Sequence, residues 1–278
     1  MMHTNGHPRS VQAEIKHIPA FEDPMPEVHS LKLLSFNIQV GIHTHAPHHY
    51  VTRGWQHLLP NANRYRTLDS IARVIADYDV VALQEIDGGS FRSGFVNQVH
   101  YLASRARFPY WYQQLNRNLG KMAQHSNGLL SRLPPANIED HRLPGLLPGR
   151  GAICVRFGQG ADAILLVMLH LSLGQRSRFR QLGYLRQLIG DYRSVVVMGD
   201  LNCHHDILLN HTELRDVNLQ PPRCHHATFP SWKPTQALDH ILVSADLQVL
   251  QSQVLNVRIS DHLPIALEIK LPPSSPPL

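Results

Sequence analysis

Cysteines, long apolar runs and linker segments are scarce in this sequence, and each scarcity excludes a class of protein. The 278 residues include three cysteines, at positions 154, 203 and 224, with no CxxC spacing. An odd number without paired spacing excludes a disulfide framework and predicts a reducing compartment. The longest apolar run, residues 163–169, is far shorter than the roughly 20 residues that cross a bilayer. Residues 1–10 lack the apolar region of a signal peptide, so we expect a cytoplasmic protein.

Composition and charge indicate a globular protein with an anionic partner. Hydrophobic residues make up 43% of the chain and charged residues 17%, which is enough to bury a core and unlike a disordered tail. Lysine and arginine number 26 against 21 acidic residues, giving a net charge of +5. This excess favours nucleic acid or phospholipid head groups as partners. No segment indicates an obligate protein partner.

The chain divides into an arm, one large domain and a tail. Residues 1–30 are polar and contain several prolines, so we expect a loose N-terminal arm. Residues 272–278 are rich in proline, which removes backbone donors, and we expect a flexible tail there. No Gly/Ser linker or repeat interrupts residues 31–271, so a single domain is predicted.

Apolar runs alternate with amphipathic segments along this domain. Helical periodicity is found over residues 68–75, 95–106 and 179–189. Runs rich in Val, Ile and Leu predict strands over residues 31–36, 80–83, 128–131, 152–157, 164–169, 194–198, 238–243 and 263–271. Interleaved strands and helices predict a layered α/β protein with two packed sheets at its core.

Conspicuous polar residues fall where these predicted strands begin or end. They are Asn37, Glu85, His170, Asp200, Asn202, Asp239, Asp261 and His262. Residues at strand ends can converge on one edge without being adjacent in sequence. Carboxylate and amide oxygens suit Mg²⁺ or Mn²⁺, and histidine transfers protons near neutral pH. A metal, a base and amide donors are what the hydrolysis of a phosphate ester requires.

The motifs that contain these residues resemble those of the endonuclease/exonuclease/phosphatase superfamily. In family order they are Asn37, Gln84-Glu85, His170-Leu-Ser172, Gly199-Asp-Leu-Asn202, Leu238-Asp239 and Ser260-Asp-His-Leu-Pro264. The superfamily includes pancreatic deoxyribonuclease, exonuclease III-type nucleases, neutral sphingomyelinases and inositol polyphosphate phosphatases. The resemblance spans residues 31–271 and implies an α+β fold. That fold is a four-layer α/β/β/α sandwich of two mainly antiparallel sheets flanked by helices.

The resemblance also implies a metal site and a group that activates water. Glu85 would be the principal ligand of Mg²⁺ or Mn²⁺, with Asn37 beside it and Asp261 close enough to contribute. Asp200 would orient or deprotonate the attacking water. Asn202 would hold the phosphate or the nucleophile.

Further residues would contact the phosphate. His262 would act as base or acid, oriented by Asp239 or Asp261. His170 would bind a non-bridging phosphate oxygen or protonate the leaving group. Arg150 resembles a phosphate-contacting arginine of the deoxyribonuclease branch, and Asn127 lies in a segment similar to one that supports the family's site.

The interpretation that follows is a divalent-metal-dependent phosphodiesterase in which water attacks phosphorus in line, with a nuclease preferred. Abasic-site nucleases carry tyrosine where His170 stands and aspartate where Gln39 stands, so the deoxyribonuclease or sphingomyelinase branch is favoured. A phospholipid phosphodiesterase or a small-molecule phosphatase is the alternative. A non-catalytic binding module is a third reading, although such a module would be expected to lose Glu85, Asp200 or His262.

Some of these residues also have purely structural explanations. Asp200 and Asn202 could cap a following helix. The Cys203-His-His205 and Cys224-His-His226 segments raise the hypothesis of a zinc site, although their spacing lacks the usual paired ligands. Four histidines in the loop after Asn37, at positions 43, 45, 48 and 49, are interpreted as a solvated or substrate-edge loop.

Overall fold

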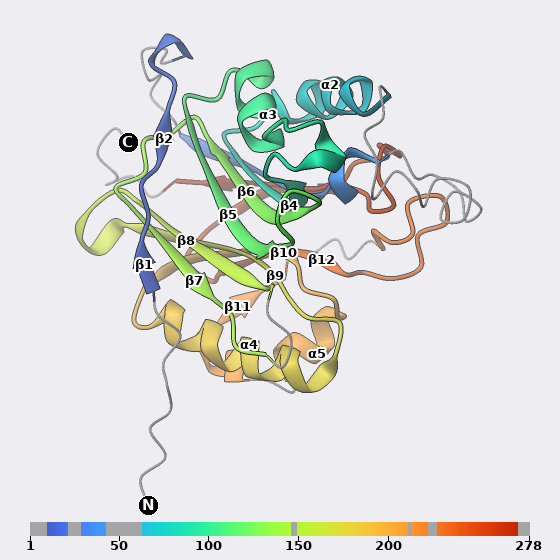
Figure 1. Ribbon diagram of the computed structural model, residues 1–278. Coiled ribbons are helices and arrows are strands. Elements are labelled where there is room, and N and C mark those ends of the chain that lie inside the picture. Colours follow the sequence, from blue (N-terminus) through green and yellow to red (C-terminus); the bar gives the residue numbers. More distant parts are fainter. Residues whose placement is uncertain are drawn as a thin grey trace, which may run out of the picture.

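Two β-sheets packed face to face form the centre of the protein, and helices cover the outer face of each (Figure 1). The structure is a computed structural model that describes residues 10–21, 29–42, 63–145, 149–210, 213–221 and 227–271. Each sheet is antiparallel except for one parallel pair of strands. The predicted four-layer sandwich is therefore confirmed.

The first sheet has seven strands in the spatial order β1-β7-β8-β9-β10-β12-β11. Their bounds are β1 Ser10–Gln12, β7 Asn137–Arg142, β8 Gly151–Phe157, β9 Ile164–His170, β10 Ser194–Asp200, β12 Asp239–Ser244 and β11 Leu219–Gln220. Strands β9 and β10 run parallel, and every residue in both is buried. Burial on both faces explains why their sequences are almost continuously apolar.

The second sheet also has seven strands, in the order β13-β14-β3-β4-β6-β5-β2. Their bounds are β13 Val249–Val254, β14 Ile265–Lys270, β3 Ser30–Asn37, β4 Val80–Asp87, β6 Gln124–Ser131, β5 Tyr110–Asn118 and β2 Lys16–His17. Strands β3 and β4 are its parallel pair. In β14 the alternating residues Ile265, Leu267 and Ile269 face the other sheet, as the period of a strand requires.

Helices cover the two outer faces. Helices α2 (Asn63–Ile75) and α3 (Gln98–Ala106) pack on the second sheet, and α4 (Gln175–Ile189) and α5 (His205–Asn210) pack on the first (Figure 1). Short 3-10 turns lie at Pro19–Phe21, Gln39–Gly41, Phe91–Ser93, Gly160–Asp162 and Glu213–Val217. None of the described helices is long and apolar enough to cross a membrane.

Several elements lie outside the sequence predictions because their sequences are polar. Strands β5, β7 and β13 lie at or next to sheet edges, where one face or both are exposed, so they lack the continuous apolar runs of the central strands. Helix α5 is too short for a clear period. The eight predicted strands are all present, most of them a few residues longer than expected.

The prediction of a loose N-terminal arm is wrong over residues 10–17. Strand β1 pairs with β7 and strand β2 pairs with β5, so this part of the arm supplies an edge strand to each sheet. The side chains within the two strands are exposed, and backbone pairing leaves no apolar signature. Between the strands, Ala13 and Ile15 pack against the core. The four histidines of residues 43–49, the Cys224–His226 segment and residues 272–278 lie outside the described residues.

Candidate active site

The two parallel strand pairs bring polar side chains to one end of the sandwich. In the second sheet Asn37 lies opposite Gln84, and in the first sheet His170 lies opposite Asp200. Asp200 also pairs with Asp239 on the other side. The Asn37 side-chain amide donates a hydrogen bond of 3.1 Å to Asp200 Oδ2, which joins the ends of the two sheets. The convergence expected from strand ends is therefore present.

Gly199 permits the close approach of β9 and β10 at this end. Its φ is +145°, and a Cβ at this position would lie 1.8 Å from the carbonyl oxygen of Leu169. No side chain fits there, because the obstacle is backbone rather than a movable side chain. The glycine thus allows Asp200 and His170 to stand side by side at the strand ends.

Asp200 is the centre of the group. Its Oδ2 accepts the Asn37 amide and lies 3.5 Å from His170 Nε2 and 4.0 Å from His262 Nε2. Its Oδ1 accepts the backbone N–H of Asn202 at 3.0 Å. Burial raises the pKa of the Asp200 carboxyl, and the neighbouring Asp239 raises that pKa further. A buried carboxylate with increased proton affinity is suited to accept a proton.

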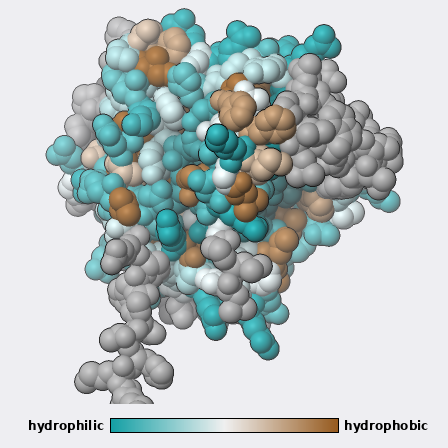
Figure 2. Space-filling model, viewed as in Figure 1, coloured by the Kyte–Doolittle hydropathy of each residue, from teal (hydrophilic) through white to brown (hydrophobic). Residues whose placement is uncertain are grey.

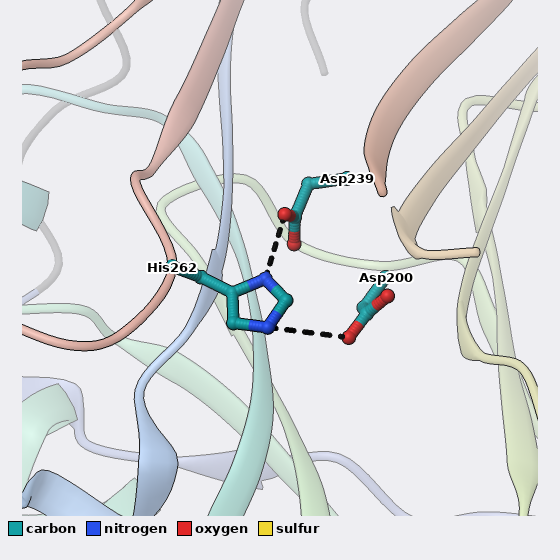
Figure 3. A group of neighbouring side chains, drawn as sticks. All are labelled: Asp200, Asp239 and His262. Atoms are coloured by element: carbon teal, nitrogen blue, oxygen red, sulfur yellow. Dashed lines mark hydrogen bonds and ion pairs between the residues drawn. The ribbon is translucent and has the colours of Figure 1, made fainter. Parts of the chain in front are cut away.

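His262 is held by Asp239. The Nδ1 of the imidazole lies 2.8 Å from Asp239 Oδ2, which also accepts the Thr228 hydroxyl at 2.5 Å (Figure 3). Figure 3 shows the opposite nitrogen of the ring directed toward Asp200. Burial lowers the pKa of His262, but the charges of Asp239, Asp200 and Asp261 outweigh burial and raise the pKa to about 10. The ring is therefore an imidazolium at neutral pH.

His170 has the opposite protonation state. Burial lowers its pKa well below 6.5, and the positive charges of Arg150 and His262 lower it further. At neutral pH this ring is uncharged and carries one N–H. His170 and His262 thus flank one carboxylate, and their surroundings shift their pKa values in opposite directions. This pattern is typical of acid–base sites.

Glu85 sits at a bulge in β4. Its φ is +54°, a left-handed conformation that is uncommon for a residue with a side chain, and the register between β4 and β6 shifts between Leu83 and Ile86. The bulge turns this side chain away from the regular alternation of the strand. Backbone outliers of this kind are concentrated at functional sites.

The charges around Glu85 fit a bound cation. Burial raises the pKa of the Glu85 carboxyl, and the negative charge of Asp261 raises it further. Three groups lower it: the charge of His262, a hydrogen bond from Asn37 and the charge of Arg150. Glu85 and Asp261 are two carboxylates that repel each other, and carboxylate oxygens are hard donors of the kind that Mg²⁺ or Mn²⁺ prefers. The Asn37 amide nitrogen donates to Asp200, and its Oδ1 accepts the backbone N–H of Gln39 at 3.2 Å. Glu85 is partly exposed and so can be reached from solvent.

A second acidic group lies nearby. Among the described residues, one group of acidic and histidine side chains has ligand atoms within 4.8 Å of one another, as a metal ion would require. It consists of Asp200, Asp239 and His262. The 2.8 Å contact between His262 Nδ1 and Asp239 accounts for part of this closeness as a hydrogen bond.

Arg150 reaches the same site from the segment before β8. Burial lowers the pKa of the Arg150 guanidinium, and the negative charges of Glu85 and Asp200 oppose that effect. The guanidinium is therefore close enough to both carboxylates to interact with their charges. Nearby, the Asn127 side-chain amide donates to Gln114 Oε1 at 3.1 Å and to Gly151 O at 3.4 Å. Asn127 thus supports the start of β8, next to Arg150, rather than facing the site's centre.

Asn202 differs from its expected role in detail. Its side-chain nitrogen donates to Leu171 O at 2.9 Å, so part of the amide holds the backbone beside His170. Helix α5 begins at His205, so neither Asp200 nor Asn202 directly precedes it as a cap would. His240 Nε2 lies 2.7 Å from the carbonyl oxygen of Cys203. The zinc hypothesis stays untested, because residues 224–226 lie outside the part of the chain that the structure describes.

Two supporting residues lie outside the sequence predictions. The Thr228 hydroxyl donates to Asp239 Oδ2, the same oxygen that contacts His262. Thr228 lies in no sequence motif that could have identified this role. Asp87, two residues after Glu85, organises the loop that follows β4 through buried hydrogen bonds. Its place in Gln84-Glu-Ile-Asp87, at the end of an apolar strand, was the available signal.

Comparison with known proteins agrees with this fold. The family model described as "Endonuclease/Exonuclease/phosphatase family" matches residues 34–262. A search of curated proteins found no match. A solved endonuclease/exonuclease/phosphatase from Beutenbergia cavernae is similar, with 18% identity, coverage of 88% of this chain and 72% of the other, and a TM-score of 0.69.

Two solved structures with named activities or ligands share the fold. D. rerio TDP2 complexed with a single-strand DNA product has 17% identity, coverage of 87% of this chain and 99% of the other, and a TM-score of 0.61. A mannosyl-6-phosphatase from Bacteroides thetaiotaomicron has 18% identity, coverage of 86% and 99%, and a TM-score of 0.59. At these identities the likeness shows the fold alone.

Proposed function

The chain belongs to the endonuclease/exonuclease/phosphatase family, whose members are phosphoesterases, and from this premise we propose that it is a divalent-metal-dependent phosphodiesterase acting on nucleic acid. In the proposed reaction, water attacks phosphorus in line with the leaving oxygen. The observation that carries the proposal is the position of two histidines at Asp200, with His170 Nε2 at 3.5 Å and His262 Nε2 at 4.0 Å from Asp200 Oδ2.

Asp200 is proposed to receive the proton of the attacking water. Its raised pKa makes it a stronger base than an ordinary carboxylate. Asn37 fixes the orientation of Oδ2 by donating to it, and the N–H of Asn202 fixes Oδ1. Because both oxygens are oriented in advance, the carboxylate needs little rearrangement when the water loses its proton.

The two histidines are proposed to bind the phosphate in different ways. The His262 imidazolium, oriented by Asp239, donates a charge-assisted hydrogen bond to a non-bridging oxygen as negative charge develops. His170 is neutral and donates its N–H to another oxygen, which favours phosphate binding over protonation of the leaving group. Arg150 adds a positive charge on the side of Glu85.

The proposed metal site is formed by Glu85, Asn37 and Asp261. Their oxygens are the hard donors that Mg²⁺ or Mn²⁺ prefers, and the repulsion between the two carboxylates supports a cation between them. When bound, the ion would neutralise charge on the phosphate and lower the pKa of a coordinated water.

Nucleic acid is the preferred substrate class. The net charge of +5 and Arg150 favour a polyanion. The same fold acts on a sugar phosphate in the mannosyl-6-phosphatase, so a small-molecule phosphatase is the alternative, and a phospholipid diester is a further one. The free, buried thiols of Cys154 and Cys203 support a reducing compartment such as the cytoplasm.

The test is a substrate panel with purified wild-type protein. Single-stranded DNA, RNA, methyl p-nitrophenyl phosphate and p-nitrophenyl phosphate are incubated with Mg²⁺, Mn²⁺ or EDTA. We expect metal-dependent cleavage of the diesters and slower cleavage of the monoester. Preferential hydrolysis of the monoester would contradict the diesterase assignment, and inactivity on every substrate with either metal would contradict the enzyme assignment.

A further inference from the structure

Five large apolar side chains are exposed together beside the candidate active site. Phe91 and Phe95 belong to the loop after β4, and Leu115, Leu119 and Met122 belong to the β5–β6 hairpin. We call these five residues the apolar patch. Phe95 is 63% exposed and Met122 is 55% exposed, values unusual for such side chains. In Figure 2 brown side chains gather over this part of the molecule.

The contacts between the loop and the hairpin make the patch continuous. The backbone N–H of Phe91 donates to the carbonyl oxygen of Lys121 at 2.7 Å, which places Phe91 at the tip of the hairpin beside Met122. The rings of Phe91 and Phe95 lie edge to face, with centroids 6.2 Å apart. Two apolar rings held this close to an aliphatic hairpin tip form one surface rather than isolated exposed residues.

Buried hydrogen bonds fix the loop that displays the two rings. The fully buried Asp87 carboxylate accepts the backbone N–H of Ser90 at 2.7 Å, the Ser93 hydroxyl at 2.8 Å and the Arg92 guanidinium at 2.5 Å. Phe95 has a φ of +61°, a strained value for a bulky residue, and its N–H donates to Ser90 O at 2.8 Å. The loop is thus held in a conformation that turns phenylalanine toward solvent, which folding alone does not require.

Basic side chains connect this patch to the phosphate site. Arg150 lies in the field of Glu85 and Asp200. The neighbouring Gly149 lies against Arg117, because a Cβ on Gly149 would be 3.2 Å from Arg117 Cβ. Lys121 is exposed at the hairpin tip among the residues of the patch. Basic side chains therefore continue from Arg150, at the candidate active site, to the apolar patch.

We infer that this surface binds the single-stranded segment of a nucleic acid next to the scissile phosphate, with bases stacked on Phe91 and Phe95 and backbone phosphates near Arg117 and Lys121. The inference rests on the proposed function. Aromatic rings interleaved with basic residues are the combination that single-stranded nucleic acids require. Bases stacked inside a duplex do not present their faces to such rings, so a single strand is preferred.

A phospholipid surface fits these observations less well. A zwitterionic lipid surface carries no net negative charge to match Arg117 and Lys121, so a membrane would bind here only with anionic head groups. A single strand carries further phosphates and further apolar bases in alternation, as the surface does. The rigid loop also suits stacking, which needs a fixed ring plane.

The test measures oligonucleotide binding separately from catalysis. Binding of a fluorescent oligothymidylate is followed by anisotropy at fixed salt, with His262→Asn as the background to prevent cleavage. We expect Phe91→Ala/Phe95→Ala to weaken binding by at least about 5-fold, because each stacked base that is lost costs about 5- to 150-fold in affinity. Phe95→Trp keeps affinity, whereas Phe95→Leu loses it, because only the former retains a π-face. Phe179→Ala, on α4 with similar exposure, is the matched control and leaves affinity unchanged.

Turnover of methyl p-nitrophenyl phosphate separates this inference from the proposed function. In an otherwise wild-type background the patch variants are expected to keep this turnover within about twofold while losing activity on oligonucleotides. If wild-type protein cleaves the small diester but patch variants bind and cleave oligonucleotides normally, the inference is wrong and the proposed function stands. Unchanged oligonucleotide affinity in Phe95→Leu would also overturn the inference. So would patch variants that no longer sediment with phosphatidylserine vesicles but still bind oligonucleotides normally.

Discussion

Replacing Asp239 by asparagine should convert His262 from an imidazolium to a neutral ring at pH 8. Both side chains are almost fully buried, and the Nδ1–Oδ2 distance is 2.8 Å. Burial lowers the pKa of His262, yet the aspartates raise it from 6.5 to about 10, with Asp239 contributing both its charge and its hydrogen bond. This difference corresponds to on the order of 5 kcal/mol in favour of the charged ring. Without the charge of Asp239, only Asp200 and Asp261 oppose burial, so the pKa of His262 should fall well below 10.

The assay for this prediction is a pH titration of the histidine ring nitrogens by NMR, with the His262 signal assigned by its absence in His262→Asn. In Asp239→Asn the midpoint should fall by several pH units, and kcat on a diester should fall about 10²- to 10⁴-fold. Asp69→Asn, which removes a carboxylate on the surface of α2, is the control and should change neither quantity. A wild-type midpoint near 6.5, or an unchanged midpoint in Asp239→Asn, would refute the reasoning.

Two further predictions concern stability. Gly199→Ala should destabilise the protein by more than about 4 kcal/mol, or prevent folding, because the added Cβ would lie 1.8 Å from the Leu169 carbonyl oxygen. Urea denaturation measures the free energy of unfolding, and a loss below about 1 kcal/mol would contradict this prediction. Burial raises the pKa of Asp87, but hydrogen bonds from Ser90 and Arg92 outweigh burial and hold it at about 2, so this carboxylate stabilises the fold above pH 4 and loses that effect as the pH falls toward 2. Asp87→Asn should therefore lower the free energy of unfolding by about 3–5 kcal/mol at pH 7. This difference from wild type should narrow by about 2 kcal/mol between pH 4 and pH 2, and a difference independent of pH would count against this assignment.

The central strands could be predicted from the sequence because burial on both faces imposes a continuous apolar run. Strands β9 and β10 are examples, and the polar residues at their ends, His170 and Asp200, stand out against that run. Strand pairing was not needed to locate them, since a polar residue that ends an apolar strand is visible in the sequence itself. Parallel pairing in the structure then explains why these two residues are neighbours.

The edges and supports of the site could not be predicted in the same way. Strand β1 is held by backbone pairing, which every sequence can provide. Thr228 contacts Asp239 from a loop whose path depends on tertiary packing. The left-handed conformation of Glu85 arises from a register shift between two strands, and neither its φ nor the direction of its side chain follows from residue type. Such features depend on how distant strands pair, so they become visible only in the three-dimensional structure.

The central claim is that Glu85 and His262 act on one bound phosphate diester. The most direct measurement is kcat for methyl p-nitrophenyl phosphate with saturating Mg²⁺ or Mn²⁺, in wild type, Glu85→Gln and His262→Asn, with melting temperatures recorded for all three. We expect kcat to fall at least about 10²-fold in each variant while the fold is retained, and we expect no wild-type turnover in EDTA. Full turnover by either variant, or by wild-type protein in EDTA, would contradict it.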